Sequence, residues 1–294
     1  MTDIKIYDVR AFQGDSAFLI DDGKTTVLYD TGFGFSGKAV TQNIKNILGE
    51  RKLDYIFLTH SHYDHALGST FVKDAYPEAK TVAGSYAASI FARPGARAVM
   101  RDMDCKAAAR YGTEICADNT DKLTADITVE DGDTVCAGDM CFRVLNLPGH
   151  TKCSVAFYSE ERKLLLGCET LGVYNGKSTV IPSMLVGYAC TLNSIERVRS
   201  LEISNILAPH MGLLTKEQTR YFLENMRPAA EAAAQLIKDC IEKGLSGEDI
   251  YKRYSASYSD SFTDEAYPED AARLNTSIMI ELIRKEFGLT GEAQ

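Results

Sequence analysis

Three histidines and one aspartate fall within seven residues, in the run THSHYDH at positions 59–65. The four residues before it, YIFL at 55–58, form a short apolar run that predicts a strand buried on both faces. Polar side chains at the carboxyl end of such a strand are typical of the functional edge of an α/β sheet. The two remaining histidines, His150 and His210, each follow a strand-like run and precede a turn. The five imidazoles are therefore expected to meet at one sheet edge.

Strand-like runs occur in both halves of the chain and predict an α/β fold. A helix is expected from about Gly37 to Leu48, because Val40 and Ile44 recur at helical spacing and Gly49 is placed to end it. The runs are separated by turn signals, as sheet strands are. They read IKIYDVRAF, SAFLIDD and TTVLYDTG in the first half, and DITVEDGDTVCAG, MCFRVLNLPGH, CSVAFYSEERKLLLGCET and ISNILAPH in the second.

The residue types at the ends of these strands predict a metal centre. Imidazole nitrogens combined with carboxylate oxygens suit divalent zinc, iron or manganese, whereas structural zinc sites are built mainly from thiolates. Five imidazoles, Asp64 and an acid near residues 168–170 exceed the ligands that one tetrahedral ion uses. Two divalent ions that share a carboxylate are therefore expected. A water held between two cations loses a proton near neutral pH and becomes a hydroxide nucleophile.

Composition and charge limit the partners and the location. The net charge of −9 counts against nucleic acid, which needs a basic face, and favours a small-molecule substrate. No apolar run is long enough to span a bilayer, and the first residues lack a secretion signal, so a cytoplasmic protein with no membrane partner is expected. The eight cysteines include no CxxC pair and are expected to be reduced thiols.

Five short motifs, in this order, resemble those of the metallo-β-lactamase superfamily. They are YDTG, THSHYDH, PGHT, GCETLG and PHMG. The resemblance covers roughly residues 4–213 and implies an αββα sandwich with a dinuclear metal centre in a cleft at one edge of its two sheets. Zinc is the metal expected from the ligand types, with iron or manganese as alternatives. Carried over residue by residue, the resemblance assigns the first metal to His60, His62 and His150, and the second to Asp64, His65 and His210.

The bridging acid departs from the family pattern, which usually has Gly-Asp at the end of the strand after PGHT. Here the run LLLG continues into Cys168 and Glu169. One alignment makes Cys168 a thiolate ligand, and the other places Glu169 in the bridge. We prefer Glu169 as the metal ligand because it keeps the carboxylate chemistry and leaves Thr170 and Leu171 in the register of the family.

Five side chains are further candidates for roles around the metals. Asp30 matches a family residue that supports the site, and a carboxylate that accepts the distal N–H of a ligating histidine fixes its tautomer. Asp64 is a candidate to orient the water or to shuttle a proton. Tyr174 or Tyr188 is a candidate hydrogen-bond donor to an oxyanion. Cys153 stands where the family usually has glycine, and packing as a small hydrophobe is favoured over a role as soft ligand or redox-sensitive thiol.

Two segments lie outside the family pattern. Residues 84–126 carry Arg93, Arg97 and Arg101 at four-residue spacing, which on a helix forms a basic stripe that either meets an anionic substrate tail or is simply solvated. Residues 214–294 are predicted to form a helical extension that follows a hydrolase domain at 1–213.

The extension is expected to begin at a capping box formed by Thr215 and Gln218. It either covers the cleft as a lid or pairs two subunits as a homodimer. A long interval before PGHT and terminal helices after the last histidine resemble the layout of the 2-aminobenzoylacetyl-CoA thioesterases of this superfamily.

The leading functional hypothesis is a dinuclear metal-dependent hydrolase of a small ester, thioester or lactone. One alternative is a di-iron redox protein related to flavodiiron oxygen reductases, although those relatives have glutamate where His62 stands and carry a flavodoxin-like domain. Another is a metal-binding regulatory protein without turnover, for which the unusual GCET motif is the only indication. A β-lactam substrate is less expected because no export signal is found.

Overall fold

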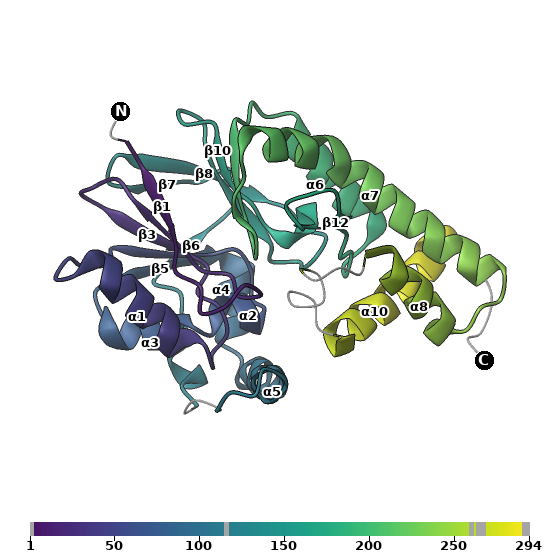
Figure 1. Ribbon diagram of the computed structural model, residues 1–294, viewed down its shortest axis with the longest axis horizontal. Helices are drawn as coiled ribbons and strands as arrows, with labels where there is room; N and C mark the ends of the chain where they lie inside the picture. Colours follow the sequence, from purple (N-terminus) through teal and green to yellow (C-terminus); the bar gives the residue numbers. More distant parts are fainter. Residues whose placement is uncertain (1–2, 115–117, 259–261, 263–268, 290–294) are drawn as a thin grey trace.

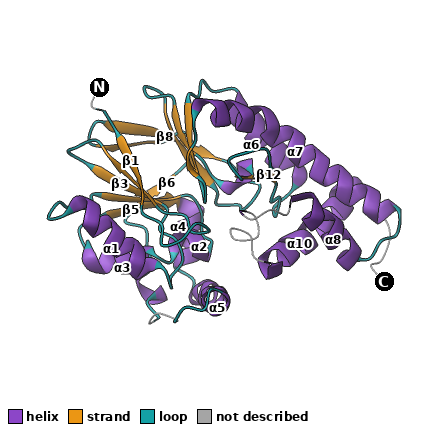
Figure 2. Cartoon of the chain, in the orientation of Figure 1, coloured by secondary structure: helices purple, strands orange, loops and turns teal. Residues whose placement is uncertain are grey.

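The computed structural model describes residues 3–114, 118–258, 262 and 269–289 (Figure 1). Within these residues two six-stranded β-sheets lie face to face, and helices cover their outer faces (Figure 2). Further helices follow the second sheet at the carboxyl end of the chain. The predicted αββα sandwich with a C-terminal helical extension is therefore confirmed. No helix in the described part of the chain is both long and apolar enough to cross a membrane.

The first sheet comes from the first half of the chain and has its strands in sequence order. β1 to β3 are antiparallel, and β3 to β6 are parallel. The strands are β1 (Lys5–Asp8), β2 (Phe18–Asp21), β3 (Thr26–Tyr29), β4 (Tyr55–Leu58), β5 (Lys80–Gly84) and β6 (Ile127–Val129). Helix α1 (Gly37–Leu48) joins β3 to β4 with the predicted bounds, and it ends at Gly49, whose φ of 58° suits a residue without a side chain.

The second sheet has the order β14-β13-β10-β9-β8-β7. Its pairs are antiparallel except for β10 and β13, which run parallel. Phe57 of the first sheet packs on Phe157 and Phe142 of the second, with ring centroids 4.6 and 5.7 Å apart. The strands are β7 (Thr134–Ala137), β8 (Met140–Asn146), β9 (Val155–Ser159), β10 (Leu164–Leu166), β13 (Asn205–Ala208) and β14 (Gly212–Leu213). A small separate sheet pairs β11 (Val173–Tyr174) with β12 (Val180–Ile181).

The helices fall into two groups, one for each half of the sandwich. An apolar cluster of the first sheet with its helices includes Ile44 and Phe91, and a second cluster joins Ile206 of the other sheet to Phe222 and Met279. The first group is α1, α2 (Tyr63–Ala66), α3 (Ser69–Ala75), α4 (Ser85–Phe91), α5 (Pro94–Arg110) and the 3-10 turn η1 (Thr120–Lys122). The second is η2 (Glu169–Leu171), α6 (Tyr188–Arg199), α7 (Lys216–Glu242), α8 (Gly247–Tyr258) and α10 (Glu269–Phe287).

The C-terminal helices begin as the sequence predicts. The Thr215 hydroxyl accepts a hydrogen bond from the Gln218 backbone at 3.2 Å, and the Gln218 side chain accepts one from the Thr215 backbone at 2.9 Å. Both bonds satisfy amides that have no partner inside the helix. Because residues of α7 and α10 share an apolar cluster with the second sheet, these helices are fixed to the body of the protein.

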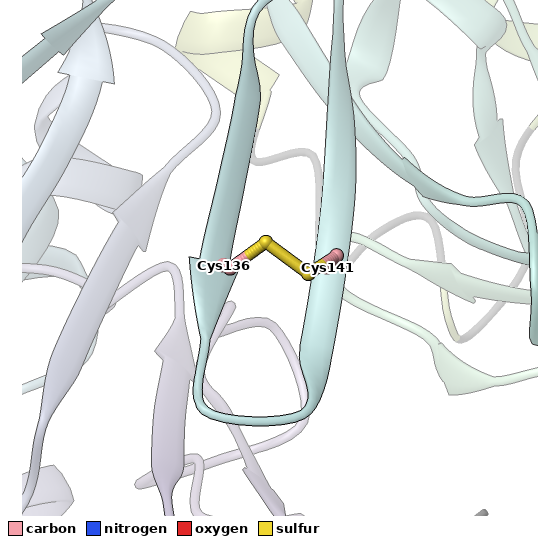
Figure 3. The surroundings of a disulfide bond; sticks show 2 residues. All are labelled: Cys136 and Cys141. Carbon is pink, nitrogen blue, oxygen red and sulfur yellow. A yellow bond between two sulfur atoms is a disulfide. The ribbon is translucent and has the colours of Figure 1, made fainter.

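The prediction that the cysteines are reduced thiols is wrong for one pair. Cys136 and Cys141 form a disulfide between β7 and β8 (Figure 3). They are direct partners in the antiparallel register, with Cα atoms 4.1 Å apart, so the hairpin itself brings the two sulfur atoms together. Cysteines five residues apart carry no recognised spacing signal, and the pairing follows only once the hairpin register is known.

Candidate metal centre

Strand ends from both sheets deliver the predicted residues to one edge of the sandwich. His60 follows β4, His150 follows β8, Glu169 follows β10, and His210 lies between β13 and β14. The helical turn α2 begins at residue 63, directly after the extended segment that carries His62. This turn reverses the chain and brings His65 back against the first histidine of the run, with ring centroids 4.2 Å apart.

Two groups of possible ligands are formed in the described part of the chain. Within each group, every residue offers an atom that lies within 4.8 Å of the others. The first group is His60, His62, His150 and Glu169, and the second is Asp64, His65 and His210. These are the seven residues that the sequence predicts as metal ligands, divided between two sites as the resemblance implies, with Glu169 in the first.

Glu169 lies where the two groups meet. Its Oε2 atom is 2.7 Å from His150 Nε2, and its Oε1 atom is 3.1 Å from His210 Nε2. The same Oε2 is 3.6 Å from His60 Nε2 and 3.7 Å from His65 Nε2. One carboxylate therefore faces imidazoles of both groups, which is the position that a bridging ligand needs.

In four of the five imidazoles, Nδ1 contacts a polar group on the side of the ring that faces away from the centre. His65 Nδ1 lies 2.7 Å from the Asp30 carboxylate, and His210 Nδ1 donates to the Gly14 carbonyl at 3.0 Å. His60 Nδ1 is 2.9 Å from the Thr59 hydroxyl, and His150 Nδ1 is 3.1 Å from the Ser183 hydroxyl. These contacts turn the four Nε2 atoms toward the centre and fix the ring orientations. His62 is the exception, because its Nδ1 faces the centre, 2.9 Å from His150 Nε2.

The backbone is strained at two of these positions. Asp30 and His210 have φ angles of 52° and 61°, in the left-handed region that residues other than glycine rarely adopt. The Asp30 carboxylate accepts hydrogen bonds from the backbone N–H and the hydroxyl of Thr59, and the Arg10 guanidinium donates to the His210 carbonyl. Such strain persists where surrounding contacts enforce it, and it is typical of functional sites.

The electrostatics of the centre suit a divalent cation. The Nε2 atoms of His60 and His65 are buried and have no hydrogen-bond partner. Burial lowers the pKa of His60 well below its usual range and lowers that of His62 to about 3, so both rings are neutral and offer lone pairs. Burial also opposes charge on His65, but Asp64 and Asp30 outweigh it and raise its pKa. The negative charges that favour a proton on this ring equally favour a metal cation at the same nitrogen.

Glu169 stays ionised in spite of its burial. Desolvation alone would raise the pKa of its carboxyl group, yet the electrostatic interaction with His150 and the hydrogen bonds from His150 and His210 hold that pKa well below its usual value. Imidazole nitrogens that face the centre, together with the carboxylates of Asp64 and Glu169, form a donor set that fits zinc, iron or manganese.

Both cysteines near the centre lie outside the two ligand groups of the described residues. Cys168 packs in the apolar cluster that contains Leu147 and Leu171, and burial raises the pKa of its thiol to about 12. Cys153 is buried as well, and its sulfur lies 3.3 Å from the Ser61 hydroxyl. The two sulfur atoms therefore pack beside the ligand loops as small side chains.

Neither tyrosine proposed as an oxyanion donor reaches the cavity beside the histidines. The Tyr174 hydroxyl donates to the Lys177 carbonyl at 2.9 Å, and its ring stacks on Phe222. Tyr188 packs against Phe287 at the start of α6. Neither tyrosine is among the described residues that line the cavity, so the structure does not place them as oxyanion donors.

Two of the three arginines of the predicted basic stripe, Arg97 and Arg101, lie four residues apart within α5 and share one of its faces. Arg93 precedes α5, while Arg97 donates to the Phe91 carbonyl at 2.7 Å and Arg101 pairs with Asp104. None of the three arginines lines the cavity at the candidate centre.

A cavity of about 160 Å³ opens beside the ligands and is lined by His62, Asp64, His150 and Glu169. The rest of its wall is mainly apolar. Helix α5 contributes Met103 to this wall, and α10 of the predicted C-terminal extension contributes Ala271, Leu274, Asn275 and Ile278. The principal apolar residues are Phe33, Tyr63, Met103, Leu185, Leu274 and Ile278.

Comparison with known proteins agrees with this architecture. The family model described as the metallo-beta-lactamase superfamily matches residues 11–210. A curated relative, Glyoxylase B2 of Dictyostelium discoideum, is 23% identical over 168 residues, which cover 54% of this chain and 53% of the relative. The chain thus spans about half the length of that relative.

Solved structures share the fold. A metallo-beta-lactamase family protein of Thermus thermophilus superposes with a TM-score of 0.67 at 20% identity, covering 98% of this chain and 96% of the other. An archaeal superfamily protein of Sulfolobus tokodaii gives a TM-score of 0.58 at 21% identity, covering 76% and 86%. Since the family model also spans most of the chain and all of its candidate ligands, the chain belongs to the metallo-β-lactamase superfamily.

Proposed function

We propose that the protein is a dinuclear metal-dependent hydrolase of a small ester, thioester or lactone. The observation that carries the proposal is the position of Glu169, whose two carboxylate oxygens face imidazoles of two adjacent ligand groups. Superfamily membership and the match to Glyoxylase B2 support hydrolysis in general. The finer choice of substrate rests on the site itself.

Each ligand group has the composition that a catalytic ion requires. His60, His62 and His150 would hold one ion, and Asp64, His65 and His210 the other, with Glu169 shared. Zinc fits this nitrogen-rich donor set best, and iron or manganese are the alternatives. Such ions supply a hydroxide nucleophile at neutral pH and polarise the carbonyl of the substrate.

Side chains of the protein orient the ligands, transfer protons and exclude water. The rings of His65 and His210 are oriented by Asp30 and by the Gly14 carbonyl, so that their Nε2 atoms face the centre. Asp64 lines the cavity and keeps 19% of its side chain exposed, which places it to accept a proton from water and pass it to the leaving group. The apolar walls keep bulk water away from the reacting carbonyl.

The His62 imidazole, whose Nδ1 faces His150, counts against the redox alternative. A glutamate at this position would give the harder donor set expected of the flavodiiron-like proteins. Thioesters are the first substrates to test, because helices follow the last histidine here as in the layout that resembles the 2-aminobenzoylacetyl-CoA thioesterases.

The test is a panel of thioesters, esters, lactones, phosphodiesters and β-lactams, assayed with metal-loaded protein and with the chelated protein as control. We expect metal-dependent hydrolysis of an acyl substrate, and loss of that activity in both His62→Ala and His150→Ala while the circular dichroism spectrum stays unchanged. Protein with a full metal complement that hydrolyses no acyl substrate would rule the function out.

A further inference from the structure

We propose that the acyl group of the substrate is short, uncharged and apolar, about the size of one six-membered ring, and that it occupies the cavity between α5 and α10. This inference rests on the proposed hydrolase function and specifies the substrate of that site. Met103 of α5 and Ile278 of α10 are the residues that we expect to set its length.

The wall of the cavity decides the polarity of its occupant. Beyond the four ligand residues, the side chains include Phe33, Tyr63 and Leu185, and among the described residues that line the cavity there is no lysine or arginine. A charged acyl group would lose its hydration without gaining a cationic side chain as a partner in this wall. An uncharged apolar group would instead gain by leaving water.

The volume decides the size of the occupant. The cavity measures about 160 Å³. An engineered cavity of about 150 Å³ lined by leucine, isoleucine and phenylalanine holds one benzene molecule, so this space admits about one ring or a chain of roughly four to six carbon atoms. Longer chains would extend beyond this space and gain no further burial in it.

Two contacts hold α10 at its position over the site. Arg110 at the end of α5 forms an ion pair with Asp270 at the start of α10 and so joins the two helices, which belong to opposite halves of the molecule (Figure 1). On the next turn, the Asn275 amide lies 3.5 Å from the Ser183 hydroxyl, which in turn contacts His150. These two contacts connect α10 to α5 and to the residue that contacts His150.

The first test is a chain-length profile of acyl thioesters on metal-loaded protein. From acetyl to butyryl and hexanoyl, kcat/KM should rise about fourfold per added methylene, benzoyl should be accepted, and both dodecanoyl and succinyl thioesters should be poor substrates. Ile278→Ala should move the optimum to longer chains. Ile278→Trp should exclude benzoyl while acetyl turnover persists.

The matched control is Ser277→Ala. Ser277 is the exposed neighbour of Ile278 on the same helix and does not line the cavity, so its replacement should leave the profile unchanged.

A binding measurement separates this inference from the proposed function. The chain contains no tryptophan, so Leu274→Trp places a single fluorophore at the half-exposed rim of the cavity. Benzoate and hexanoate should change its emission, and succinate should not. Selective binding without hydrolysis of any ester would contradict the proposed hydrolase function but support the inferred specificity of the cavity. Hydrolysis with a flat chain-length profile, or with Ile278→Trp equally active on benzoyl and acetyl thioesters, would overturn the inference.

Discussion

Replacing Glu169 by glutamine removes one negative charge from the centre and keeps the shape of the side chain. The carboxylate is 3% exposed and lies 2.7 Å from His150 Nε2 and 3.1 Å from His210 Nε2. If it spans two cations, the variant leaves them without their shared charge in a site largely closed to water. Removing one partner of a buried charge pair costs about 3–5 kcal/mol, which corresponds to roughly a hundredfold to several thousandfold weaker binding of at least one ion.

The assay is metal affinity by competition with a chromophoric chelator, together with turnover of the best acyl substrate. Glu169→Asp keeps the charge and should bind two ions with intermediate affinity, whereas Glu160→Gln makes the same chemical change at an exposed position and should alter nothing. Wild-type affinity for both ions together with the wild-type rate in Glu169→Gln would refute a bridging role for this carboxylate.

Three further predictions follow from the buried groups and the hairpin. Cys168→Ala should keep the full metal content and lose about 1 kcal/mol of unfolding free energy, because only a buried sulfur is removed; loss of metal would make Cys168 the ligand. Burial raises the pKa of Asp104 to about 6, above its unfolded value, so the ionised carboxyl is disfavoured in the folded state and stability falls as the pH rises from about 4 to 6. Asp104→Asn should remove this loss, and its urea-unfolding free energy relative to wild type should grow by up to about 3 kcal/mol over that range; a constant difference would contradict the assignment. Replacing Cys136 and Cys141 by serine should cost at most about 2 kcal/mol and leave turnover unchanged, since the disulfide closes a short hairpin at the sheet edge away from the ligands; eight reactive thiols in the unfolded wild type without reductant would show that the bond does not form.

Patterns of neighbouring residues predict the helices and the strand ends, because these depend mainly on interactions between residues close in the sequence. The helix from Gly37 to Leu48 follows from its apolar spacing and its terminal glycine, and both ends agree with the sequence prediction. The gathering of five histidines at one edge follows because each of them stands at the end of a strand. The resemblance to a known family adds the face-to-face arrangement of the two sheets, which strand patterns alone leave open.

Contacts between residues that are far apart in the sequence could not be predicted from it. Ser183 lies 33 residues from His150, and Gly14 lies 196 residues from His210, so no spacing marks either as the partner of a ligand. The apolar face of α10 is visible in the sequence, but its placement over the cavity depends on how the helices pack on the second sheet.

The most direct test of the account is the metal content of purified, metal-supplemented protein, compared with that of His60→Ala and His210→Ala, which alter one ligand group each. Two groups of ligands joined through Glu169 predict about two divalent ions per chain in the wild type and close to one in each variant. One ion or none in the wild type would contradict the dinuclear centre.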